Sequence, residues 1–100
     1  MNYTYLLHPL ALEDYSKAYA WHEDVQRGLG ERFIKAVRSK IDKIVENPET
    51  FGSRDRKEFR EAQVEPFPYL IVYKIHKRKR LIHISAIHHM KKDPNKKYRK

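Results

Sequence analysis

The alternation of hydrophobic and polar positions divides the chain into two parts with different periods. In the first part, residues 3–7 are rich in aromatic and apolar side chains, which is typical of a short strand. Pro9 suits the first turn of a helix, where its missing N–H costs nothing. An apolar face then recurs at helical spacing and consists of Ala11, Tyr15, Ala18, His22 and Val25. Gly28 and Gly30 break this pattern, so the helix is predicted to end near Arg27.

A second helix follows the glycines. Its apolar stripe consists of Phe33, Val37, Ile41, Ile44 and Val45. Asn47 and Pro48 end it, because a residue that precedes proline is pushed out of the helical region. Only a few residues separate the two helices, which predicts an antiparallel helix hairpin.

After Phe51 the hydrophobic period changes to that of strands. Residues 52–57 are polar and charged, which predicts a loop. Strands are predicted at residues 59–64, 69–76 and 81–87, joined by short links that contain proline or lysine and arginine. Consecutive strands with short links form an antiparallel meander.

These elements predict an α+β domain in the order β-α-α-β-β-β. The helix hairpin is expected to pack on one face of a mostly antiparallel sheet and to leave the other face open for binding. In the last strand, strict alternation places Ile82, Ile84 and Ala86 on one face. The opposite face is expected to carry Leu81, His83, Ser85 and Ile87.

Positive charge is concentrated in the C-terminal half. Residues 1–50 contain 7 Lys/Arg and 8 Asp/Glu, whereas residues 51–100 contain 15 and 5, within an overall net charge of +9. A basic half on a small domain attracts nucleic acid, an anionic membrane or an acidic protein segment. A merely solubilising surface is the alternative interpretation.

Composition excludes several classes of function. The chain has no cysteine, so it has no disulfide framework or thiolate chemistry, in agreement with a reducing, cytoplasmic location. Its N-terminus does not resemble a signal peptide, and no segment approaches the roughly 18 apolar residues of a membrane span. Neighbouring His88 and His89 would point apart on a strand, and no carboxylate or cysteine accompanies them at ligand spacing. With no glycine-rich phosphate loop either, we expect neither a metal nor a cofactor.

Several segments, taken in order, resemble a known family. They are residues 18–23 with 30–33, residues 41–51, residues 59–62 with 67–73, and residues 84–89 with Asp93 and Pro94. Their order and spacing resemble the RelE/ParE superfamily of bacterial toxins over nearly the whole chain. The resemblance implies one toxin domain at residues 1–90 and a basic tail at residues 91–100.

The resemblance also implies a function. Members are toxins of type II toxin–antitoxin modules, neutralised by an antitoxin that wraps them, here with an acidic, partly disordered segment. RelE-like members cut messenger RNA in the ribosome, and ParE-like members poison DNA gyrase and are not nucleases. Phe67-Pro68-Tyr69 and the His-Asp-Pro tail resemble the ParE side more closely. Outside the family, a non-toxic basic RNA- or DNA-binding module stays open.

If the protein is RelE-like, metal-free RNA cleavage requires a base, cations and an acid. The catalytic candidates are then Arg60, His88, His89 and Tyr98. Period-two alternation sends one of the two histidines towards the core and the other outward, so at most one is expected to be catalytic. Arg60 has a second interpretation as a partner of neighbouring glutamates or of the antitoxin, and Tyr98 as an unordered tail residue.

The remaining cations are expected to meet nucleic acid or a protein partner. They are Arg54, Arg56 and Lys57 before the second strand, Lys77 and Arg78 in a turn, and Lys91 and Lys92 after the last strand. His22 lies on the apolar helix face and is interpreted as a satisfied core histidine. Tyr19 and Trp21 fall off the main stripe and are expected to pack the helix hairpin or to meet a partner.

Overall fold

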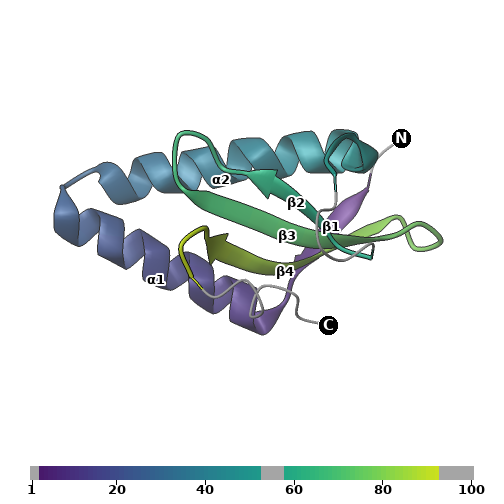
Figure 1. Cartoon of the computed structure of the whole chain (residues 1–100), viewed down its shortest axis with the longest axis horizontal. Helices are drawn as coiled ribbons and strands as arrows, with labels where there is room; N and C mark the ends of the chain where they lie inside the picture. The colour runs from purple at the N-terminus through teal and green to yellow at the C-terminus, as the bar shows by residue number, and fades with distance from the viewer. Residues whose placement is uncertain (1–2, 53–57, 93–100) are drawn as a thin grey trace.

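The computed structural model describes residues 3–52 and 58–92 and has two layers, a helix hairpin packed on a four-stranded sheet (Figure 1). Its elements are β1 (Thr4–Leu7), α1 (Pro9–Val25), α2 (Leu29–Glu46), the 3₁₀ turn η1 (Pro48–Thr50), β2 (Arg60–Gln63), β3 (Tyr69–His76) and β4 (Leu81–His89). The predicted α+β order is confirmed, and element ends differ from the predicted ones by at most two residues. None of the helices in the described part is long and apolar enough to cross a membrane.

The sheet has the strand order β1-β4-β3-β2. β2 pairs with β3, and β3 with β4, in antiparallel fashion, whereas β1 lies parallel to β4. The sheet is therefore mostly antiparallel, as predicted. The main core fills the space between the helices and one sheet face, with Phe33, Val37 and Ile44 from α2 packed against residues such as Tyr73 and Ile84.

A β-bulge interrupts the pairing of β3 with β4. Tyr73 lies opposite Ile84 and Val72 lies opposite Ala86, so Ser85 has no opposite residue on β3. One extra residue in a strand reverses the alternation of side chains beyond it. The two faces of β4 are therefore exchanged after Ser85.

This exchange corrects the predicted faces of the last strand. Ile87, and not Ala86, joins Ile82 and Ile84 in the core under the helices. Ala86 instead packs with Val72 in a smaller cluster on the opposite face of the sheet. The prediction was wrong beyond the bulge because it assumed an unbroken period of two.

The helix hairpin is closed by one carboxylate. The Glu23 side chain of α1 accepts hydrogen bonds from the N–H groups of Gly28 and Gly30, each at 3.0 Å, at the start of α2. Gly28 has a φ of 89°, a left-handed conformation that favours glycine. A Cβ on Gly30 would lie 2.8 Å from the ring of Tyr19, so only glycine permits this close approach of the helices. The carboxylate also complements the positive end of the α2 dipole.

We therefore expect Glu23→Ala to lower the free energy of unfolding by about 1–3 kcal/mol, because it leaves two partly buried N–H groups without their acceptor. Urea denaturation followed by circular dichroism measures this change. Glu13→Ala is the matched control, since Glu13 makes only an exposed ion pair with Lys17 on the same helix. Equal losses in the two variants would contradict the role given to Glu23.

Candidate functional site

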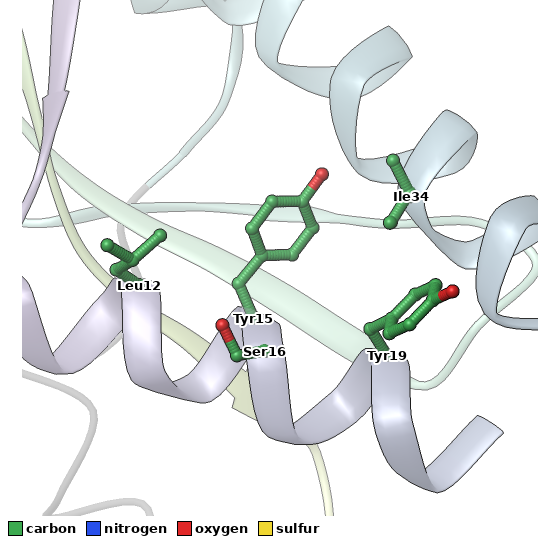
Figure 2. A pocket seen from close by; sticks show the side chains of 5 residues that line it. All are labelled: Leu12, Tyr15, Ser16, Tyr19 and Ile34. Atoms are coloured by element: carbon green, nitrogen blue, oxygen red, sulfur yellow. The ribbon is translucent and has the colours of Figure 1, made fainter. Parts of the chain in front are cut away.

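A groove runs along the outer side of the helix hairpin. It has a volume of about 300 Å³ and is lined by Leu12, Tyr15, Ser16, Tyr19 and Ile34 (Figure 2). Figure 2 shows the Tyr15 and Tyr19 rings rising from α1 towards the side of α2 that carries Ile34. Leu12 is 52% exposed, so the groove presents apolar surface to solvent. Such an apolar groove between helices is suited to receive a side chain or helix of a protein partner.

Tyr15 gives this groove a polar group. Burial raises the pKa of the Tyr15 hydroxyl, and the Arg38 guanidinium, which is its hydrogen-bond partner, opposes that rise. The phenol therefore stays protonated at neutral pH, with a cation from α2 beside it. An acidic partner with apolar side chains would complement both properties of the groove.

The sequence carried a signal for this groove. Leu12, Tyr15, Ser16 and Tyr19 recur at i, i+3, i+4 and i+7, which is a second helical stripe beside the core-facing one. Tyr19 was expected to pack the hairpin or meet a partner, and it packs against Gly30 while lining the groove. Its neighbour Trp21 is exposed.

The helix-facing side of β2 carries Arg60. Its guanidinium donates hydrogen bonds to the backbone carbonyls of Phe51 and, at 3.3 Å, of Glu49, just where the chain leaves η1. Two further contacts hold the same turn: the Tyr73 hydroxyl donates to the Pro48 carbonyl at 2.7 Å, and Lys77 pairs with the Glu49 carboxylate at 2.8 Å. Arg60 and Lys77 therefore join η1 to the sheet. A catalytic or binding role for either stays a prediction.

His88 and His89 lie on opposite faces of β4, as expected from alternation. His88 follows Ala86 on the face turned away from the helices and is only 7% exposed. His89 is half-buried on the helix side, where its ring lies 4.9 Å from that of Tyr69. Burial, together with Lys91, Lys92 and His22, lowers the pKa of His89.

The structure does not bring the described catalytic candidates together. Arg60 lies opposite Tyr73, whereas His88 lies opposite Leu70, nearer the other end of β3, and on the other face of the sheet. Of the remaining candidate cations, Arg78, Lys91 and Lys92 are exposed around the ends of β3 and β4. Arg54, Arg56, Lys57 and Tyr98 lie outside the described residues.

Two other expectations concern His22 and metals. His22 is 4% exposed, its Nδ1 is hydrogen-bonded to the Ala18 carbonyl at 2.6 Å, and its ring stacks on Phe33 at 4.7 Å. The interpretation as a satisfied core histidine is therefore confirmed. Within residues 3–52 and 58–92, no group of three histidine, cysteine or acidic side chains is placed to hold a metal ion.

Comparison with solved structures shows which class of protein has this architecture. The chromosomal ParDE toxin–antitoxin system of P. aeruginosa is similar, with a TM-score of 0.76 and 11% identity over 89% of this chain and 97% of that one. The E. coli toxin RelE, as an arginine double mutant in the free state, has a TM-score of 0.69 and 17% identity over 91% and 86%. The same RelE mutant with a peptide of its antitoxin RelBc has a TM-score of 0.65 and 18% identity over 88% and 83%. The fold is therefore that of RelE/ParE toxins.

The sequence places the chain more narrowly within this class. Residues 5–94 match the family described as the ParE toxin of the type II toxin–antitoxin system parDE. The chain belongs to that family. None of the curated protein sequences compared with the chain matches it.

The depressed pKa of His89 predicts how stability depends on pH. The folded state disfavours the protonated ring, whereas the unfolded chain takes up the proton near the ordinary histidine pKa of about 6.5. Unfolding therefore binds protons, and the free energy of unfolding should fall as pH drops below that value. Urea midpoints measured from about pH 8 to about pH 5 check this.

His89→Gln should make that decline shallower. The decline should not vanish, because the pKa of His83 is also lowered, chiefly by burial. A midpoint that varies with pH as steeply in His89→Gln as in the unaltered protein would contradict this account of His89.

Proposed function

We propose that this protein is the toxin of a type II toxin–antitoxin module, which arrests growth and is held inactive by a cognate antitoxin. The observation that carries the proposal is the ParE family match over residues 5–94. The arrangement of helix hairpin and sheet, shared with the ParDE system of P. aeruginosa, supports it. The cytoplasm is the compartment where such a toxin would meet its target.

DNA gyrase is the target that we propose, and the protein is then not a nuclease. The ParE side of the superfamily implies this target. The separation of the catalytic candidates supports the gyrase target. Arg60 binds the end of η1 on the helix-facing side of the sheet, and His89 packs beside Tyr69 on that same side. His88 is buried on the opposite face. Metal-free RNA cleavage needs its acid, base and cations around one phosphate.

The groove on the helix hairpin is the docking site that we propose for the antitoxin. An acidic, partly disordered segment that folds on binding would place apolar side chains between Leu12, Tyr19 and Ile34. Its carboxylates would meet Arg38 beside Tyr15. The peptide bound to RelE in the E. coli complex is an antitoxin segment, which supports this kind of partner.

Induced expression in bacteria that carry translation and DNA-damage reporters tests the target. We expect growth arrest with filamentation and an early DNA-damage response, while translation continues at first. His88→Gln and His89→Gln should leave toxicity unchanged. An immediate stop in translation with cleaved transcripts, abolished by either variant, would identify a nuclease instead. Harmless expression at high level would refute the toxin assignment and favour a non-toxic nucleic-acid-binding module.

The docking site is tested with Leu12→Asp. This change places a charge in the groove, so it should weaken binding of the antitoxin at least tenfold, or about 1.4 kcal/mol, in calorimetric titration. In cells, the variant should stay toxic when the antitoxin, expected from an adjacent gene, is co-expressed. Leu10→Asp is the matched control, because Leu10 is similarly exposed on α1 but does not line the groove. Equal affinity of the two variants for the antitoxin would exclude the groove as its docking site.

A further inference from the structure

Three histidine rings lie side by side on the sheet face that is turned away from the helices. The ring centroids of His8 and His83 are 5.8 Å apart, and those of His83 and His76 are 6.3 Å apart. His83 lies between the core residues Ile82 and Ile84 in β4, so alternation turns it to the opposite face. The three residues come from the start of α1, from β3 and from β4, and only the fold brings them together.

A lysine completes this group. Lys74 lies opposite His83 in the pairing of β3 with β4, and its ammonium group is 5.5 Å from the centre of the Phe59 ring. We call His8, His76, His83 and Lys74 the histidine row. The turn beside it, residues 77–80, consists entirely of lysine and arginine. The row lies at the end of β3 and the start of β4, and the turn joins the two strands there, so basic side chains gather at this end of the sheet.

His8 has a fixed role within the row. Its Nδ1 accepts a hydrogen bond from the Leu10 N–H at 3.0 Å, so the side chain caps the N-terminus of α1. A nitrogen that accepts carries no proton, so the proton of the neutral ring lies on Nε2. His8 therefore presents Nε2–H as its hydrogen-bond donor.

We propose that the histidine row is a proton-dependent binding site for the phosphodiester backbone of a nucleic-acid strand. Protonated histidine and lysine supply charge-assisted donors to phosphate oxygens. Flat histidine rings also stack on unpaired bases. An acidic peptide carries negative charge but no bases, so a nucleic-acid strand fits the row better. Leu6, paired with His83 in the β1–β4 register and 59% exposed, adds apolar surface for a base. This site is distinct from the groove and from the catalytic candidates.

The electrostatics give the direction of the pH dependence. Burial lowers the pKa of His83, and so do His8, His76 and Lys74. Among the residues that the structure describes, the charged and titratable groups that shift this pKa are all basic. A bound phosphate would offset this repulsion and favour the protonated ring. Affinity should therefore rise as the pH falls below the ordinary histidine pKa of about 6.5.

The test measures binding of a fluorescein-labelled single-stranded oligothymidylate to the full chain by fluorescence anisotropy, at fixed salt. We expect binding at least tenfold tighter at about pH 5.5 than at about pH 8, a difference that the double variant His76→Gln/His83→Gln loses. The matched control is Lys35→Gln/Lys43→Gln, which removes two exposed positive charges from α2 and should keep the pH dependence. Lys74→Gln tests the site without altering a histidine and should weaken binding at both pH values.

Four outcomes would overturn the proposal. They are affinity independent of pH, an equal loss in the α2 control, unchanged affinity in Lys74→Gln, or a polyglutamate peptide that binds as tightly with the same pH dependence. The last would assign the surface to an acidic protein segment. Nuclear magnetic resonance of the His83 ring gives a direct check, since the oligonucleotide should raise its pKa. Failure here leaves the toxin proposal standing, because toxicity is measured separately.

Discussion

The antiparallel pairing of β3 with β4, with its one extra residue at Ser85, is the interaction on which the rest of the structure depends. β4 lies between β3 and β1, and the bulge decides which of its side chains meet the helices. β1 pairs with β4 only as far as Ile84; beyond that point the Asp14 carboxylate of α1 accepts the Ile87 N–H at 3.1 Å. The bulge thus brings Ile87 into the core at the place where α1 covers the open strand edge.

The basic C-terminal half has two kinds of use in this fold. Arg60 and Lys77 are engaged with η1, the first through carbonyl oxygens and the second through Glu49, so part of the positive charge is structural. Arg78, Lys91 and Lys92 stay exposed. A count of charges does not separate structural cations from exposed ones. A sequence does not show whether a lysine or arginine side chain binds a carbonyl oxygen or water.

Hydrophobic periodicity was sufficient to predict the helices, the strands and the layer arrangement, because each element buries one regular face. Periodicity did not predict the features that do not arise from a repeating pattern of side chains. Nothing in the letters around Ser85 marks a bulge, so the faces after it were reversed. The Glu23 contact with Gly28 and Gly30 depends on how two helices meet, and the histidine row depends on strand register. The groove was not predicted either, although the spacing of its residues on α1 carried a signal for it.

The close approach at Gly30 has a consequence for how such a toxin evolves. Tyr19 packs against the glycine with one part of its ring and also lines the groove, so hairpin closure and the proposed antitoxin site share a side chain. Under this assignment, a substitution of Tyr19 that frees the toxin from its antitoxin also opens a void where the helices touch. A toxin variant that escapes neutralisation by this route is therefore also less stable. This coupling limits the appearance of active toxin variants that the antitoxin no longer binds.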